Sequence, residues 1–259
     1  MQQEEGSRWF VEMIGEICRE QSIALRLLSG NWLLELRKND RTARILGYTF
    51  DLNSSVASSI SKDKVATSEL LAAYAIPAIS HTLIRLHDAK KEWQALDWKD
   101  GVVVKPLTGL GGQHVRLFYD DKKAEEFMRN QRIEAWAVSP LRSIIEETRL
   151  IMLDGELLFA YGKQPVDIGN LKVFNLSKGA QPIASSPGKE YMELAKRTQE
   201  IIGLRVCAID IVRLASGELT ILEVNSGVTA QKYLQHNLDD KEEVRRMYAR
   251  VVEAMFDKK

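Results

Sequence analysis

Two groups of residues in this sequence have types and spacings that could do chemistry. The first is VVVKPLTGLGGQHV at positions 102–115, where an apolar run ends at Lys105 and Gly109, Gly111 and Gly112 follow. Glycine permits positive φ and close backbone approach, so successive N–H groups could turn towards a phosphate, and Lys105 would add a point charge. An ordinary glycine-rich hairpin with an exposed lysine is the alternative. The segment is not a Walker loop, because no Gly-Lys-Ser/Thr follows the glycines.

The second group consists of oxygen-bearing residues near the C-terminus. Asp210 stands between Ile209 and Ile211, and Glu223 and Asn225 follow in ILEVN. Residues at i and i+2 of a strand face the same side, so Glu223 and Asn225 would share a face that Asp210 could join. Asp, Glu and Asn offer only oxygen ligands, which suit a hard divalent cation. An acidic stripe facing solvent is the alternative, but a carboxylate between two isoleucines is costly to bury unpaired, which favours a metal site.

The elements that must position these groups are predicted from periodicity and turn residues. Helices are predicted at 9–20, 64–74, 88–97, 122–130, 190–202 and 241–256. Strands are predicted at 23–28, 32–36, 44–48, 100–105, 115–119, 135–138, 149–153, 156–160, 206–214 and 218–224. Asp154-Gly155 is the strongest hairpin signal. Residues 51–61 are expected to form an irregular link, and 162–189 a long loop that orders on binding. Hairpins mixed with helices predict an α+β fold.

Composition narrows the functional classes. The 259 residues carry 36 basic and 36 acidic side chains, a formal net charge of zero. This balance argues against nucleic acid or an anionic membrane as the main partner. A chain of this length can bury a core without disulfides, so Cys18 and Cys207 are expected to be buried thiols. No apolar signal segment or membrane-length run is visible, which leads us to expect a cytoplasmic protein.

The order of these motifs resembles the ATP-grasp superfamily. Lys105 with its glycine-rich segment comes first, and IDI at 209–211 and LEVN at 222–225 follow. Within the superfamily the chain is most similar to carboxylate–amine ligases such as ribosomal-protein glutamate ligase, the ligase domain of cyanophycin synthetase and bifunctional glutathione synthetases. The resemblance begins near Ser61. It implies an ATP-grasp fold with a short N-terminal α/β region at 1–60, a subdomain carrying a glycine-rich flap at 61–134, and a subdomain carrying a metal site at 135–259.

The resemblance also implies which residues bind the nucleotide. Lys64 and Lys105 would meet the ATP phosphates, and Gly109, Gly111 and Gly112 would form the flap above them. The hinge at Val138-Ser139-Pro140-Leu141 would bind adenine, with Ser139 and Leu141 as its backbone contacts. Glu147 would bind the ribose.

The resemblance also implies which residues bind the metal and which take part in acyl transfer. Asp210, Glu223 and Asn225 would be the ligands of Mg²⁺ or Mn²⁺. Asn175 and Lys178 would meet the transferred phosphate and the acyl group, and Arg149 or Lys178 would stabilise the oxyanion. The four histidines show no metal-ligand spacing, so His81, His87 and His236 are interpreted as structural or surface residues. His114 is set apart because it ends the flap where many relatives have glycine.

The implied activity is that of an ADP-forming ligase. ATP would phosphorylate a small-molecule or peptide carboxylate, and an amine would attack the acyl phosphate to give an amide or peptide bond. Neither nucleic acid nor membrane is expected as a partner, and the apolar stripe of the C-terminal helix would suit a homo-oligomer. The alternatives are an ATP-grasp kinase or carboxylase-type enzyme, and a nucleotide-binding regulatory protein without turnover.

Overall fold

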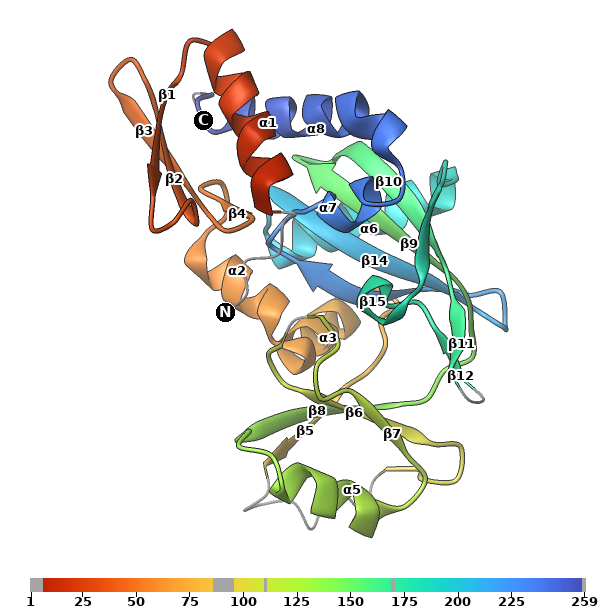
Figure 1. Cartoon of the computed structure of the whole chain (residues 1–259). Coiled ribbons are helices and arrows are strands. Elements are labelled where there is room, and N and C mark those ends of the chain that lie inside the picture. The colour runs from red at the N-terminus through yellow and green to blue at the C-terminus, as the bar shows by residue number, and fades with distance from the viewer. Residues whose placement is uncertain (1–6, 86–95, 110, 169–170, 258–259) are drawn as a thin grey trace.

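The computed structural model describes residues 7–85, 96–109, 111–168 and 171–257. Figure 1 shows two parts, with a small sheet carrying β5–β8 at one end and a larger body around β9, β10, β14 and β15. Strands in all of the described sheets pair antiparallel. The fold is therefore α+β, as predicted.

The N-terminal region begins with one amphipathic helix and continues as a meander. Helix α1 (Ser7–Glu20) is followed by β1 (Ala24–Leu28), β2 (Leu33–Lys38), β3 (Arg41–Leu46) and β4 (Thr49–Phe50), in the sheet order β1-β2-β3-β4. Alternate side chains such as Leu34, Leu36 and Ile45 point inward and are fully buried, as the period of two in a strand requires. The predicted helix and hairpins are confirmed here.

The expected irregular link at 51–61 is wrong, because α2 (Ser55–Lys62) occupies most of it. Ser54 caps this helix, since its hydroxyl accepts a hydrogen bond from the N–H of Ala57 at 3.1 Å. Serine-rich segments favour turns and helix caps alike, so composition alone did not distinguish the two. Helix α3 (Lys64–Ala73) follows, as predicted, and begins at Asp63, whose carboxylate accepts from two N–H groups of the first turn.

The small subdomain is a four-stranded sheet with one described helix. The strands are β5 (Thr82–Arg85), β8 (Ala135–Pro140), β6 (Val102–Pro106) and β7 (Arg116–Phe118), in that spatial order, and α5 (Asp121–Arg129) contributes to the same core. Val104, Met128 and Trp136 are fully buried between sheet and helix. The helix predicted at 88–97 falls almost wholly outside the described residues.

The large body is built on a five-stranded sheet in the order β13-β10-β9-β14-β15. Its strands are β9 (Ile144–Leu153), β10 (Glu156–Gln164), β13 (Gln181–Ala184), β14 (Val206–Leu214) and β15 (Leu219–Asn225). The hairpin predicted at Asp154-Gly155 is confirmed, and both turn residues have positive φ. Helix α6 (Lys189–Ile202) packs on one face of this sheet.

The predicted loop at 162–189 is largely wrong. Strand β10 runs to Gln164, and β11 (Val166–Ile168), β12 (Leu171–Val173), the 3₁₀ turn η1 (Leu176–Lys178) and β13 follow. These strands are short and carry polar residues, so they show no hydrophobic period. Strands β11 and β12 pair with each other, and β13 pairs with β10.

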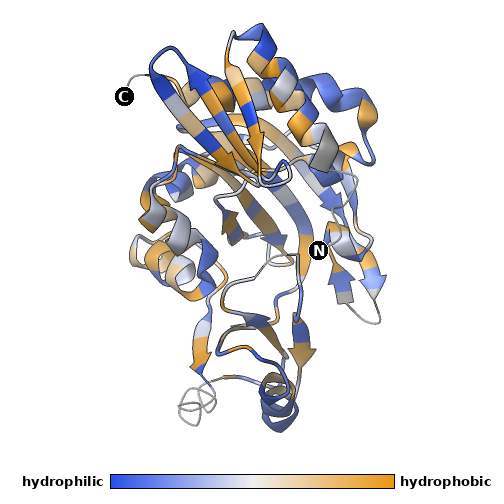
Figure 2. Cartoon of the chain, turned by 60° about the vertical axis from the view of Figure 1, so that its left-hand side comes forward, coloured by the Kyte–Doolittle hydropathy of each residue, from blue (hydrophilic) through white to orange (hydrophobic). Residues whose placement is uncertain are grey.

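The N-terminal region and the C-terminal part of the chain share one core. Helix α7 (Gln231–Leu234), the turn η2 (Leu238–Asp240) and helix α8 (Lys241–Ala254) end the chain, and α1 lies beside α8 in Figure 1. Buried residues of α1, such as Ile14, join Ile45, Ile151 and Val251 in one cluster. Figure 2 shows hydrophobic and hydrophilic residues alternating along the helices, as in amphipathic elements.

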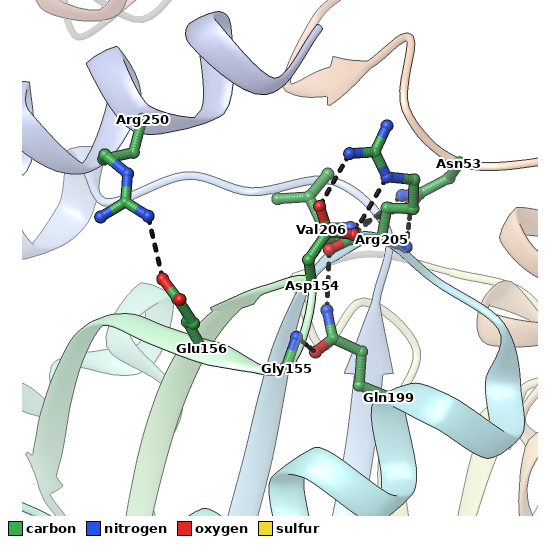
Figure 3. Close-up of polar contacts among 8 residues, drawn as sticks. All are labelled: Asn53, Asp154, Gly155, Glu156, Gln199, Arg205, Val206 and Arg250. Atoms are coloured by element: carbon green, nitrogen blue, oxygen red, sulfur yellow. Dashed lines mark hydrogen bonds and ion pairs between the residues drawn. The ribbon is translucent and has the colours of Figure 1, made fainter. Parts of the chain in front are cut away.

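A polar cluster fastens the N-terminal region to the start of β14 (Figure 3). The side chain of Asn53 donates to the carbonyl of Val206 at 2.8 Å and accepts from the N–H groups of Arg205 and Val206. Arg205 in turn pairs through two nitrogens with Asp154 in the β9–β10 turn. Within the described ranges, no helix is long and apolar enough to span a membrane.

Candidate active site

Four charged side chains gather on one face of the central sheet. Asp210 on β14 lies opposite Arg149 on β9, and Glu147 on β9 lies opposite Lys163 on β10. Directly opposed residues of antiparallel strands share a face, so the register alone brings these four together. Ile151 and Val206, farther along the same face, belong to the core shared with α1 and α8. One face of the sheet is thus apolar where α1 and α8 cover it and carries the charged cluster beyond them.

The cluster is a closely paired ionic network. Arg149 donates from Nε to Asp210 Oδ1 at 2.8 Å and from Nη2 to Oδ2 at 2.6 Å. Lys163 Nζ donates to Asp210 Oδ1 at 3.1 Å and to Glu147 Oε1. Asp210, Glu147 and Lys163 are all less than a tenth exposed. Two cations and two carboxylates balance, which offsets the desolvation that each buried charge costs.

The pKa values in this network follow from burial and pairing. Burial acts to raise the pKa of Asp210, but Arg149 and Lys163 outweigh it and hold the pKa well below its ordinary value. For Glu147 burial wins and raises the pKa, although Lys163 opposes this. Asp210 is therefore a permanent carboxylate at neutral pH, whereas Glu147 is the member closest to taking up a proton.

The three predicted metal ligands lie on neighbouring strands. Asp210 is opposite Glu223 in the β14–β15 register, and Asn225 stands two residues farther along β15. The Nδ2 atom of Asn225 is buried without a partner. This oxygen-donor set fits a hard divalent cation. Both oxygens of Asp210 are engaged by Arg149 and Lys163, and the described residues contain no cluster of three His, Cys, Asp or Glu able to hold a metal. The metal assignment remains a prediction.

The two predicted phosphate lysines meet beside Glu223. Lys64 begins α3, and its N–H donates to the carbonyl of Leu107 just after β6, so helix and strand end are tied together. Lys64 and Glu223 line one surface hollow, which has about 280 Å³ of empty space and also includes His81. The Lys105 Nζ lies 3.3 Å from the Nε2 of His81. Burial lowers the pKa of Lys105 to about 8, while Glu223 nearby opposes the shift.

The glycine-rich segment contacts the predicted acyl-transfer residues. Gly111 and Gly112 have φ values of +67° and +70°, which L residues with side chains rarely adopt. A Cβ atom on Gly112 would lie 2.4 Å from Asn175 Nδ2 and 3.9 Å from Lys178 Cε. Gly109, by contrast, has ordinary space around it. Gly112 is therefore required for the loop to approach Asn175.

Asn175 is held in place by its own turn. Its Oδ1 accepts from the N–H of Ser177 at 2.8 Å, which caps η1 and places Lys178 at the end of that turn. Lys232 on α7 donates to the hydroxyl of Ser177. The turn is thus joined to α7, the first helix after the candidate metal ligands on β15.

The hinge residues and Glu147 differ from expectation in their contacts. Ser139 is buried on β8, and the N–H of Leu141 donates to the carbonyl of Gly101 at 2.9 Å. That N–H is occupied and does not offer itself to an adenine edge. The carboxylate of Glu147 is paired with Lys163 in the sheet network. The adenine and ribose assignments of these residues stay predictions.

Two residues of the site make contacts that the sequence did not predict. Lys163 was placed in the supposed loop, although Phe159, Tyr161 and Lys163 alternate at a strand period and could have indicated an inward-facing lysine. His81 was interpreted as structural, and no local signal in the sequence connects it with Lys105. Their contact depends on how the segment after α3 packs against β6.

Comparison with known proteins gives a family match over most of the chain. Residues 61–244 match the RimK-like ATP-grasp domain. A probable alpha-L-glutamate ligase of Alkalilimnicola ehrlichii is 30% identical over 189 residues, which cover 72% of this chain and 62% of the relative. The chain thus spans about six tenths of that relative's length.

Solved structures share the fold at low sequence identity. D-cycloserine synthetase DcsG superposes with a TM-score of 0.57 at 19% identity, covering 74% of this chain and 70% of that one. A bifunctional glutathione synthetase from Pasteurella multocida gives 0.56 at 14% identity, covering 89% of this chain and 42% of that one. The architecture is the ATP-grasp fold, and the chain belongs to the RimK-like ATP-grasp family.

Proposed function

We propose that this protein is an ATP-dependent carboxylate–amine ligase. ATP would phosphorylate a carboxylate, an amine would attack the acyl phosphate, and an amide or peptide bond, ADP and phosphate would result. The observation that carries the proposal is the convergence of Lys64, Lys105 and Glu223 beside the Arg149–Asp210 network. The lysines proposed to bind phosphate stand on α3 and β6, and the arginine proposed to act on the carbonyl group stands on β9.

Phosphate binding is assigned to the two lysines and the glycine-rich loop. The ammonium groups of Lys64 and Lys105 would neutralise charge as the γ-phosphoryl moves, and loop N–H groups at Gly111 and Gly112 would donate to its oxygens. Asp210, Glu223 and Asn225 would hold Mg²⁺ (or Mn²⁺), which when bound supplies positive charge against the phosphates. Positioning and charge, not covalent catalysis by the protein, would then lower the barrier.

Acyl transfer is assigned to residues at the other side of the site. Arg149 uses Nε and Nη2 to bind Asp210, and its Nη1 carries two further N–H donors for the developing oxyanion. Asn175 and Lys178 lie beside Gly112. Closure of the glycine-rich loop over the nucleotide would therefore place them near the transferred phosphate. The same closure would exclude water, which otherwise hydrolyses an acyl phosphate.

The test is ADP release from ATP and Mg²⁺ with pools of carboxylates and amines. Because the relative is named a probable glutamate ligase, glutamate is the first substrate to offer in either role. We expect ADP to form only when both a carboxylate and an amine are present. Phosphorylation of one substrate alone would indicate a kinase, and nucleotide binding without turnover would indicate a regulatory protein.

A second measurement tests the metal assignment. Glu223→Gln removes a charge but keeps the shape of the side chain, so we expect the fold to be retained and turnover to be lost. Circular dichroism and thermal unfolding check the fold. Turnover close to the wild-type rate in a folded Glu223→Gln variant would exclude Glu223 as a metal ligand.

A further inference from the structure

The ammonium of Lys105, a partly buried residue, has an unusual partner. Its contact is the Nε2 atom of His81 at 3.3 Å, and in the described part of the chain Lys105 makes no ion pair within 4.0 Å. Lys163, which is buried, instead pairs with two carboxylates. A lysine that contacts an imidazole in place of a carboxylate is not neutralised by a direct ion pair, although Glu223 and Glu147 are near enough to raise its pKa.

His81 is fixed by elements on both sides of the hollow. Its N–H donates to the hydroxyl of Ser68 on α3 at 3.3 Å. Two residues earlier, the N–H of Ile79 donates to the carbonyl of Ile221 on β15 at 2.9 Å, and the N–H of Ile221 donates back to Pro77. His81 is only 8% exposed. Its backbone is therefore held on both sides, and its Nε2 atom faces a lysine on β6, in the sheet that also contains β5.

Burial and two nearby lysines keep the His81 imidazole neutral, so that it can accept a hydrogen bond. Burial, with Lys105 and Lys64 nearby, lowers the pKa of His81 to about 3. An ammonium can only donate, so Nε2 must accept and the ring proton must sit on Nδ1. A carboxylate here would also accept the hydrogen bond, but it would neutralise Lys105 and repel an incoming phosphate.

We propose that His81 is a positioning residue that orients the Lys105 ammonium toward the nucleotide phosphates while leaving its charge intact. This inference rests on the proposed function, because it assumes that Lys105 binds phosphate. The proposal gives His81 a role in binding, whereas the absence of metal-ligand spacing in the sequence had indicated a structural or surface role.

Four variants of His81 separate positioning from packing. The amide oxygen of Gln reaches the place of Nε2, whereas the shorter Asn offers its oxygen near the place of Nδ1. Titration with a non-hydrolysable ATP analogue and Mg²⁺ should give near wild-type affinity for His81→Gln. His81→Asn and His81→Leu should bind about tenfold more weakly, as for one lost hydrogen bond to a charged group. His81→Asp should bind at least as weakly as His81→Leu.

Adenosine serves as the control ligand. It lacks phosphates, so it should bind all four variants with the same affinity. In a Lys105→Met background, His81→Leu should cause no further loss, since His81 acts through Lys105. Thermal unfolding of His81→Gln and His81→Asn should coincide within a few degrees, so that a difference in binding reflects the position of the acceptor.

Nitrogen-15 NMR of the free protein provides a readout without nucleotide. We expect the neutral Nδ1–H tautomer for His81, with an Nε2 resonance that moves in Lys105→Met. Equal ATP-analogue affinity of His81→Leu and wild type, additive losses in the double variant, or the Nε2–H tautomer would each overturn the proposal alone. Failure of the wild-type protein to bind the analogue would overturn the proposed function and this inference together.

Discussion

Lys163 is the residue on which two buried carboxylates depend. It donates to both Glu147 and Asp210, and each of the three side chains is less than a tenth exposed. Asp210 keeps Arg149 as a second partner, but Glu147 pairs with Lys163 alone among the ion pairs of the described residues. Loss of Lys163 therefore leaves one buried carboxylate without compensation.

We predict that Lys163→Met lowers the free energy of unfolding by about 3–5 kcal/mol, the cost of leaving a buried charge unpaired. Urea denaturation at pH 7 measures this change. Adding Glu147→Gln to the same chain removes the stranded charge and should restore a large part of the stability. A double variant no more stable than Lys163→Met would show that Glu147 is not the source of the loss.

Lys105 makes nucleotide binding dependent on pH. Its pKa is lowered to about 8, first by burial, with Lys64 lowering it and Glu223 and Glu147 raising it. An anionic nucleotide prefers the protonated lysine, so affinity is full below pH 8 and is lost as the pH rises through 8. The decline should reach about tenfold per pH unit at most, the limit for one proton.

Titrations with the ATP analogue between pH 6.5 and 9.5 measure this dependence. Lys105→Arg stays charged throughout the range, so its affinity should be nearly independent of pH. A decline of the same size in Lys105→Arg would assign the titration to another group.

At the scale of elements, the glycine-rich segment and η1 form one contact. Gly112 approaches Asn175 so closely that a Cβ would overlap its amide, whereas Gly111 has the same positive φ and open space around it. The two glycines thus share a backbone conformation and differ in what lies beside them.

We predict that Gly112→Ala lowers the rate of ADP release by about tenfold to a hundredfold, because displacing Asn175 misplaces groups at the reacting centre. Gly111→Ala meets the same backbone strain, about 1 kcal/mol, without the collision. It should lose less activity. Equal losses in the two variants would attribute the effect to the backbone and not to Asn175.

Elements that are indicated by a short run of neighbouring residues could be predicted from the sequence. The turn Asp154-Gly155 and the apolar run before Lys105 predicted strands that the structure confirms. Helix α2 and strands β11 to β13 were not predicted, because a serine-rich segment suits a turn as well as a helix cap and these strands are only three or four residues long. The family pattern led to Asp210, but its pairing with Arg149 and Lys163 follows from strand register, which no single segment encodes.

At the scale of the molecule, the buried apolar residues of the described chain form three clusters of unequal size. The cluster that contains Ile14 of α1 also contains Val206 of β14 and Val251 of α8. The small subdomain keeps its own cluster around Val104 and Trp136. The N-terminal region is thereby part of the body that holds the charged network, and the flap-bearing sheet is packed separately.

Because the clusters are separate, substitutions that create a cavity in different clusters should affect different parts of the chain. Ile14→Ala and Val104→Ala each remove a fully buried branched side chain, and we expect the larger Ile14 truncation to cost about 2–5 kcal/mol. Hydrogen exchange followed by mass spectrometry should show faster exchange of α1, β14 and α8 together in Ile14→Ala. In Val104→Ala the acceleration should stay within β5–β8 and α5, because a cooperative unit opens as a whole. Faster exchange of α1 alone in Ile14→Ala would mean that the N-terminal region opens independently of the body on which it packs.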